Sequence, residues 1–179
     1  MAHNRSFIFK PPSARGQALH QDNLYLQSHP ETCIAAWIAI DPCDDENGGL
    51  IVIPGSHRNQ ILCPVEADST ISFSNDTVPL PRTDPNDPTN PMIKVQTVMK
   101  PGDVLFFHGD LVHGSMPNTS RDRFRRSLIF HYIPQESVEV ARFYQPLIGP
   151  DGGEVVEIKV AEGVELVVRV GLMRGIEDA

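Results

Sequence analysis

Two residues near the start of the chain, His20 and Asp22, carry side chains suited to binding a metal, and a single position separates them. Their surroundings, residues 17–26, have the pattern of an extended segment. Side chains in a strand alternate between its two faces, so we expect these two on one face and Gln21 on the other. A neutral imidazole and a carboxylate are two of the three protein ligands of a 2-His-1-carboxylate Fe(II) site. Such a site needs one more histidine and leaves coordination positions open for O2 and a co-substrate.

Seven histidines are present, and most are poorly placed to be the third ligand. Two candidates, His108 and His113, lie close together after an apolar stretch. The other four are a residue near the start, two in turns and one in an apolar strand, where a satisfied core or surface histidine is the more ordinary reading: His3, His29, His57 and His131.

A second His-x-Asp pair, His108 with Asp110, competes with the first. The glycine between them indicates a tight bend, which would separate the two side chains. Only His131 follows this pair as a distant partner. The set that joins a local pair to one distant strand, His20, Asp22 and His113, is therefore preferred.

The best candidate for a co-substrate anchor lies twelve residues after His113. Arg125 and Ser127 are two positions apart on a predicted strand, so guanidinium and hydroxyl share a face, whereas Arg126 points the other way. A guanidinium binds a carboxylate through two parallel, charge-assisted hydrogen bonds, which suits the far end of a dicarboxylate. Taken alone, an arginine-rich stretch is more often a solvated turn. The nearby metal ligands favour the anchor.

The elements that would position these residues are short strands separated by Gly, Pro and Asn turns, which predicts an all-β sandwich or barrel, of which the jelly roll is one form. Residues 32–40 are predicted to be buried on both faces, and residues 136–144 are the one plausible helix. Residues 68–91, rich in proline and polar residues, are a candidate lid loop. The predicted strands cover residues 6–9, 17–26, 32–40, 50–53, 92–99, 104–107, 111–115 and 126–133, and a terminal hairpin covers residues 154–170.

The composition fits one domain over residues 1–179 and argues against several function classes. A net charge of −8 with one short basic cluster, residues 121–126, does not favour nucleic-acid binding. No apolar run is long enough to span a membrane, and the first residues lack the apolar core of a signal peptide. Three cysteines without CxxC spacing suggest reduced thiols in the cytoplasm.

Taken together, these motifs resemble the phytanoyl-CoA dioxygenase-like family of Fe(II)/2-oxoglutarate-dependent oxygenases. The order and spacing of the motifs agree with that family from about residue 6 to residue 134. The matching segments are His20-Gln21-Asp22 with Tyr25, Trp37, Asn47-Gly48-Gly49-Leu50, Pro54-Gly55-Ser56-His57, residues 101–107, His113-Gly114-Ser115 and Phe124-Arg125-Arg126-Ser127.

The resemblance implies a double-stranded β-helix, or jelly roll, that holds iron through the His/Asp/His set. It implies that 2-oxoglutarate chelates this iron and that Arg125 holds its far carboxylate, with Ser115 and Trp37 lining the pocket. The implied reaction uses O2, converts 2-oxoglutarate to succinate and CO2, and hydroxylates an unactivated C–H bond. Related halogenases have a small residue in place of the carboxylate, so Asp22 favours hydroxylation.

The preferred function is therefore an Fe(II)/2-oxoglutarate hydroxylase of a small molecule, for which a homo-oligomer is an open option. Two alternatives remain: a catalytically silent jelly-roll binding domain, and a cupin-type metal enzyme that does not use 2-oxoglutarate. Family members carry a substantial region before the His-x-Asp strand, whereas 19 residues precede His20 here. We expect that region to be short or missing. The sequence does not identify the substrate.

Overall fold

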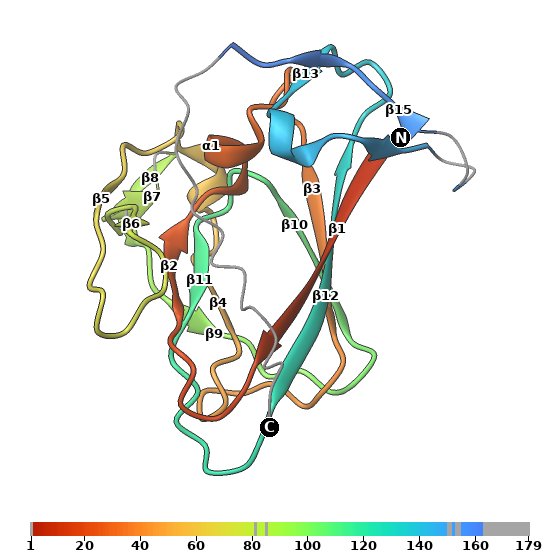
Figure 1. Cartoon of the computed structure of the whole chain (residues 1–179). Coiled ribbons are helices and arrows are strands. Elements are labelled where there is room, and N and C mark those ends of the chain that lie inside the picture. The colour runs from red at the N-terminus through yellow and green to blue at the C-terminus, as the bar shows by residue number, and fades with distance from the viewer. Residues whose placement is uncertain (1, 81, 85, 150–151, 153–154, 163–179) are drawn as a thin grey trace.

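Two antiparallel sheets face each other across a shared core in the computed structural model, which describes residues 2–80, 82–84, 86–149, 152 and 155–162 (Figure 1). This is the all-β, jelly-roll architecture predicted from the sequence. The larger sheet has the order β10(Val104–His108), β3(Ile34–Ala39), β12(Arg125–Ile133), β1(Ala2–Lys10), β14(Leu147–Ile148), β15(Val155–Val156). The smaller sheet has the order β2(Gln17–His20), β11(His113–Ser115), β4(Leu50–Val52), β9(Val95–Gln96).

The core between the sheets is built by alternate residues of the central strands. Ala35, Trp37 and Ala39 of β3 are all buried and point inward. They pack with Leu50 of β4 and Ile129 of β12, so the same cluster joins both sheets. Trp37 is 2% exposed and is the largest of the fully buried side chains among the described residues. The period-two burial that strands produce thus fixes which side chains face the interior.

The outer face of the larger sheet is apolar and exposed, so the prediction that residues 32–40 are buried on both faces was wrong. Ile34 on β3 is 43% exposed, and Phe106 on the neighbouring β10 is 66% exposed. On β1, Phe7 lies opposite Leu128 of β12, which places both on this outer face. The apolar character of β3 therefore reflects the core on one side and an uncovered surface on the other.

The helices differ from the prediction. The single α-helix among the described residues is α1(Asp22–Leu26), which follows β2 directly at one end of the sandwich (Figure 1). The helix predicted at residues 136–144 is absent, because that segment contains a strand, β13(Glu139–Val140), and one 3-10 turn, η2(Arg142–Tyr144). A second 3-10 turn is η1(Ser56–Arg58). Within the described residues, no helix is long and apolar enough to cross a membrane.

The segment predicted as a loop, residues 68–91, contains three short strands and contributes to two small antiparallel ladders. These are β5(Val65–Glu66) with β6(Asp76–Thr77) and β7(Thr83–Asp84) with β8(Asp87–Pro91). The segment is tied to β2, since the Ser72 hydroxyl accepts the Ala18 N–H at 2.9 Å. Val78 is 2% exposed and packs in a cluster with Ile53 and Val112.

The first half of the terminal hairpin predicted over residues 154–170 contains two short strands in place of one continuous strand. Two short strands there join different partners: β15 pairs antiparallel with β14, and β16(Lys159–Val160) pairs parallel with β13. The second half, residues 164–170, lies outside the described residues. The half-buried strand predicted over residues 92–99 is reduced to β9, whereas β1 is longer than its predicted residues 6–9.

Candidate metal centre and co-substrate pocket

The strand β2 ends at His20, so Asp22 is the first residue of α1 and does not lie in a strand as predicted. The two side chains still share a face, because Gln21 between them keeps extended dihedrals of φ −117° and ψ 128°. His113, on β11, is the direct cross-strand partner of His20. The end of one strand, the start of a helix and a neighbouring strand therefore bring the three side chains together.

The three predicted ligands converge tightly. Each offers one ligand atom, and these atoms lie within 4.8 Å of one another. The Oδ1 atom of Asp22 is 3.6 Å from the Nε2 atom of His20 and 3.6 Å from that of His113. All three residues are buried. Within the part of the chain that the structure describes, this is the one such group of three or more His, Cys, Asp or Glu side chains.

The hydrogen bonds of both histidines direct the same ring atom at the centre. His20 Nδ1 lies 2.9 Å from the carbonyl oxygen of Ala18, and His113 Nδ1 lies 2.9 Å from that of Leu111. A carbonyl oxygen only accepts, so each Nδ1 carries the proton and each Nε2 keeps a free lone pair. The Gln17 amide nitrogen lies 3.2 Å from the His20 Nε2, at the position where a metal would compete for that lone pair.

The charges of the site also suit a divalent cation. Burial lowers the pKa of His113 to about 4, with a further contribution from His20, so this imidazole is neutral at neutral pH. Burial alone would raise the pKa of Asp22, but the neighbouring His113 and His131, with the hydrogen bond from His131, hold it well below its usual range. Two imidazole nitrogens and one ionised carboxylate oxygen are a fitting donor set for Fe(II).

The competing pair, His108 and Asp110, is not part of this group. His108 Nδ1 is 3.4 Å from Asp110 Oδ2, so the two residues contact each other. The imidazole of His108 is 36% exposed, whereas the three converging side chains are at most 9% exposed. Gly109 packs against Asn23 at the start of α1, where an added Cβ would clash with the Asn23 Oδ1. The bend at this glycine therefore does not separate the two side chains as predicted, and the missing side chain lets the backbone pass close to Asn23.

Sequence reasoning set aside His131, but the structure places it against Asp22. Its Nε2 atom donates a hydrogen bond to the Asp22 Oδ2 over 3.1 Å, and both side chains are buried. A signal was available in β12: Arg125 and Ser127 point inward, and two further steps of two reach His131. The apolar neighbours of His131 in the sequence favoured an ordinary core or surface histidine with no part in the site.

The predicted anchor also faces the interior. Arg125 is 3% exposed and Ser127 is fully buried, and the guanidinium Nη1 donates to the Ser127 hydroxyl over 2.9 Å. The guanidinium carbon lies 5.5 Å from the centroid of the Trp37 ring. Arg126 points outward as expected and forms an ion pair with Asp41 at 2.7 Å. Arg125 has no acidic partner among the described residues.

Ser115 is buried beside a residue that the sequence analysis did not consider. The ammonium of Lys10, the last residue of β1, donates to the Ser115 hydroxyl over 2.7 Å. Lys10 is 3% exposed. Lys10 stands at a strand end before two prolines, where a lysine is ordinarily solvated. No local sequence pattern therefore indicates that it is buried. The pairing of β1 with β12, which is not local in sequence, buries it.

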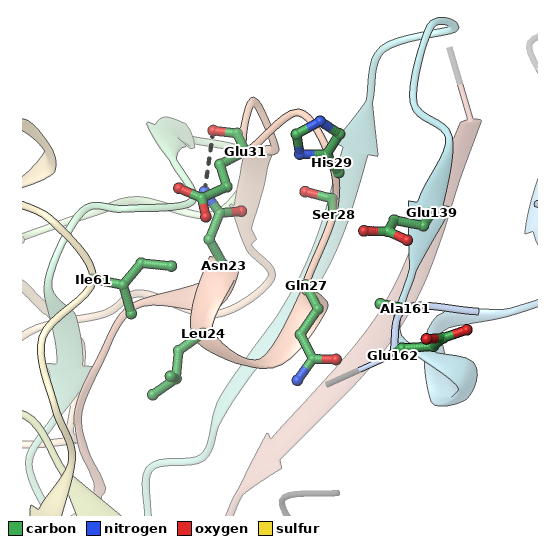
Figure 2. A pocket seen from close by; sticks show the side chains of 10 residues that line it. All are labelled: Asn23, Leu24, Gln27, Ser28, His29, Glu31, Ile61, Glu139, Ala161 and Glu162. Carbon is green, nitrogen blue, oxygen red and sulfur yellow. Dashed lines mark hydrogen bonds between the residues drawn. The ribbon is translucent and has the colours of Figure 1, made fainter. Parts of the chain in front are cut away.

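A separate hollow of about 300 Å³ lies beside α1 and is shown in Figure 2. None of its lining residues is a predicted site residue. In this view Asn23 donates to the Glu31 carbonyl, as the dashed line marks. The lining residues are Asn23, Leu24, Gln27, Ser28, His29, Glu31, Ile61, Glu139, Ala161 and Glu162.

A jelly roll with a buried His/Asp/His group defines a class of proteins, the metal-binding double-stranded β-helices. Within that class, the sequence model of the family described as "Phytanoyl-CoA dioxygenase (PhyH)" matches residues 1–127. The chain belongs to this family.

Named relatives support the assignment. The phytanoyl-CoA dioxygenase of Arabidopsis thaliana is 32% identical over 138 residues, which cover 76% of this chain and 45% of the relative. The peroxisomal phytanoyl-CoA dioxygenase of Mus musculus is 34% identical over 138 residues, which cover 74% of this chain and 39% of the relative. The match thus spans less than half the length of these relatives.

Solved structures share the fold. EvdO2 from Micromonospora carbonacea var. aurantiaca, crystallised with 2-oxoglutarate, superposes with a TM-score of 0.52 at 25% identity, covering 72% of this chain and 51% of that one. SnoN, an epimerase of nogalamycin biosynthesis crystallised with Fe3+ and alpha ketoglutarate, gives a TM-score of 0.58 at 19% identity, covering 92% and 63%. At that identity, SnoN supports the fold alone.

Proposed function

We propose that this chain is the catalytic jelly roll of an Fe(II)- and 2-oxoglutarate-dependent oxygenase that hydroxylates an unactivated C–H bond of a small molecule. The observation that carries this proposal is the convergence of His20, Asp22 and His113 inside the sandwich. When bound there, iron supplies the activation of O2. In the overall reaction, O2, 2-oxoglutarate and R–H become succinate, CO2 and R–OH, so one oxygen atom enters each organic product.

The protein's own part in this reaction is to bind, orient and exclude water. His20, Asp22 and His113 would hold the iron and leave coordination positions open for the 2-oxo acid and O2. Arg125, held by Ser127, would bind the far carboxylate of 2-oxoglutarate through its guanidinium. Trp37 and Ser115 would line the same pocket, and the buried indole would keep water away from the chelate.

The carboxylate at position 22 supports hydroxylation over halogenation. Asp22 is ionised and close to both histidines, so it would fill the coordination position that a halide would need.

We further propose that residues 68–91 form one wall of the substrate entrance. Asp76, in this segment, helps to raise the pKa of Tyr25, although burial is the larger cause. The Tyr25 ring centroid lies 6.1 Å from that of His20. The segment therefore lies close to a residue that contacts the metal centre. A wall that moves should show faster amide exchange at Val78 without substrate than with it.

The exposed outer face of the larger sheet supports self-association. Phe7 and Phe106 are 56% and 66% exposed, and monomeric proteins rarely leave large contiguous apolar patches uncovered. We propose that two copies pack through this face. Light scattering should give a dimer for the purified chain, and Phe106→Lys should shift it toward monomer. A monodisperse monomer at about 100 μM would contradict the proposal.

We also propose a single domain over residues 1–179 that works in a reducing compartment, the cytoplasm, without nucleic-acid or membrane partners. The three cysteines support this compartment because none is disulfide-bonded. The basic cluster, residues 121–126, does not offer all its charges to a nucleic acid, because Arg123 pairs with Asp44 at 2.8 Å and Arg126 pairs with Asp41. Some relatives are named as peroxisomal enzymes, so the peroxisome is the alternative location. Imaging a tagged chain in its own cells distinguishes the two.

The function is tested by anaerobic titration of the metal-free protein with Fe(II) and then with 2-oxoglutarate. Expected is the weak visible charge-transfer band of a 2-oxo acid chelate, followed by succinate formation when O2 and a substrate are supplied. His113→Ala should lose the band by losing iron. Arg125→Met should retain iron and lose 2-oxoglutarate.

Arg126→Met is the matched control, because Arg126 is the adjacent arginine and points to solvent. It should leave the band and the iron affinity unchanged. Iron binding without a band in the wild-type protein would contradict 2-oxoglutarate as the co-substrate. A band that survives in His113→Ala would contradict the ligand set.

A further inference from the structure

Lys10 and Arg125 are direct cross-strand partners at the end of the β1–β12 ladder. Paired residues of neighbouring strands point to the same face of a sheet. Both are 3% exposed, so two cationic side chains lie next to each other inside the sandwich.

The hydrogen bonds of the two cations interlock. The Lys10 ammonium donates to the Ser115 hydroxyl and to the Met116 carbonyl, both over 2.7 Å, and to the Gly48 carbonyl over 3.3 Å. The Arg125 Nε donates to the same Gly48 carbonyl over 3.2 Å. The lysine thus reaches from the larger sheet to β11 of the smaller sheet, where Ser115 lies two residues after His113.

Neither cation has an anionic partner among the described residues. Other arginines do: Arg58, Arg123 and Arg126 each form an ion pair with an aspartate. Burying two adjacent positive charges without a counter-charge is costly. Burial, followed by the Arg125 charge, accordingly lowers the pKa of Lys10 to about 7. Neutral side chains could join the sheets here without that cost.

We infer that Lys10 is a second binding residue for the far carboxylate of 2-oxoglutarate, placed beside Arg125 and held by Ser115. The inference rests on the proposed function and deepens it. Two cations would meet one carboxylate, so this end of the pocket selects 2-oxo acids by charge. A 2-oxo acid with an uncharged tail would keep its chelating end and lose both contacts.

The test compares two ligands of the iron-loaded protein by anaerobic titration of the visible band. These are 2-oxoglutarate and 2-oxopentanoate, a five-carbon 2-oxo acid that ends in a methyl group. We expect Lys10→Met to weaken 2-oxoglutarate at least tenfold and to leave 2-oxopentanoate within twofold. Lys100→Met, at an exposed turn, is the control and should change neither affinity.

Equal weakening of both ligands in Lys10→Met would show a structural role and overturn the inference, while the band in the wild-type protein would still support the proposed function. The absence of the band in the wild-type protein would contradict both the inference about Lys10 and the proposed function.

A measurement on the wild-type protein covers the case in which Lys10→Met does not fold. The ratio of the affinities for 2-oxoglutarate and 2-oxopentanoate should fall as the pH rises above about 7, because a neutral amine attracts the carboxylate less. The groups that act on Lys10 are the Arg125 guanidinium, charged throughout, and the Cys43 thiol, whose pKa burial raises to about 11. Effects of pH on the metal ligands act on both 2-oxo acids and cancel in the ratio. A ratio independent of pH from 6 to 9 would overturn the inference.

Discussion

His131 and Asp22 form a buried hydrogen bond of 3.1 Å that uses the carboxylate oxygen pointing away from the other two histidines. The opposite oxygen, Oδ1, is the one that lies 3.6 Å from His20 and His113. The bond therefore fixes the rotation of the carboxylate and directs Oδ1 to the candidate metal position. Partners of this kind orient metal ligands and raise affinity without touching the metal.

We predict that His131→Phe weakens metal binding by about 10- to 100-fold, the usual effect of removing a ligand's hydrogen-bond partner. The ring keeps most of the packing volume against Tyr144, whose ring centroid lies 5.5 Å away. Anaerobic calorimetry with Fe(II) measures the affinity directly. His108→Gln, at a partly exposed histidine outside the group, should leave it unchanged. Equal affinities in wild type and His131→Phe would show that the carboxylate is held by other contacts.

The convergence of the three candidate metal ligands could be predicted from the sequence because their spacing is local or follows strand alternation. His20 and Asp22 required one extended residue between them, and Gln21 provides it even though β2 has ended. The positions of His131 and Lys10 could not be predicted from the sequence in the same way. The positions of these two residues, against Asp22 and beside Arg125, depend on the pairing of strands that are far apart in the chain, and such register is not encoded in a short motif.

Gly48 has a positive φ of +72° and almost no free space around its Cα. An added Cβ would lie 2.5 Å from the Met116 carbonyl oxygen and 3.1 Å from the Lys10 ammonium. We predict that Gly48→Ala lowers the free energy of unfolding by about 3 kcal/mol, from backbone strain plus the clash. Gly102→Ala is the matched control: its φ is +90° and nothing lies within 4 Å, so the strain acts alone and should cost about 1 kcal/mol.

Urea denaturation of both glycine variants measures these losses. If the two substitutions cost the same, the space around Gly48 does not matter and φ explains both effects. A larger loss at Gly48, together with weaker 2-oxoglutarate binding, is the expected pattern, because the clash displaces the lysine.

The charge state of Lys10 should also appear in the stability of the ligand-free protein. Its pKa is lowered from 10.5 to about 7 by burial and then by Arg125, so between these values the unfolded chain binds the proton and the folded protein has released it. The free energy of unfolding therefore rises with pH over this window, by up to a few kcal/mol. Urea denaturation of wild type and Lys10→Met at pH 6, 8 and 10 tests this. The stability of wild type relative to the variant should increase with pH, and a constant difference would contradict the lowered pKa.

The fold class could be predicted from short strands and turns, but helix positions could not. α1 covers five residues, too few for a helical period, and it begins where the sequence still has the pattern of a strand. The prediction that β3 is buried on both faces was also wrong for its outer face. Ile34 belongs to an apolar run that predicts full burial, yet it is 43% exposed. An apolar run in the sequence shows that a strand face is apolar, but it does not show whether another part of the protein covers that face.

Gln21 determines how the chain passes from β2 into α1, and we predict that it matters for both stability and metal binding. It is fully buried, its amide nitrogen donates to the Asp110 carbonyl over 2.9 Å, and its amide oxygen accepts the Leu62 N–H over 2.8 Å. Gln21→Ala would leave that carbonyl and that N–H buried without partners, which costs about 1–3 kcal/mol for each group.

The free energy of unfolding of Gln21→Ala should therefore fall by about 2–6 kcal/mol, and iron affinity should fall with it, because the flanking candidate ligands lose their fixed spacing. Gln60→Ala, at an exposed position, is the control and should change neither quantity. Denaturation and anaerobic iron titration on the same preparations separate the two effects. A variant that is destabilised but binds iron with wild-type affinity would show that His20 and Asp22 are held by other contacts, of which the bond from His131 is the first to test.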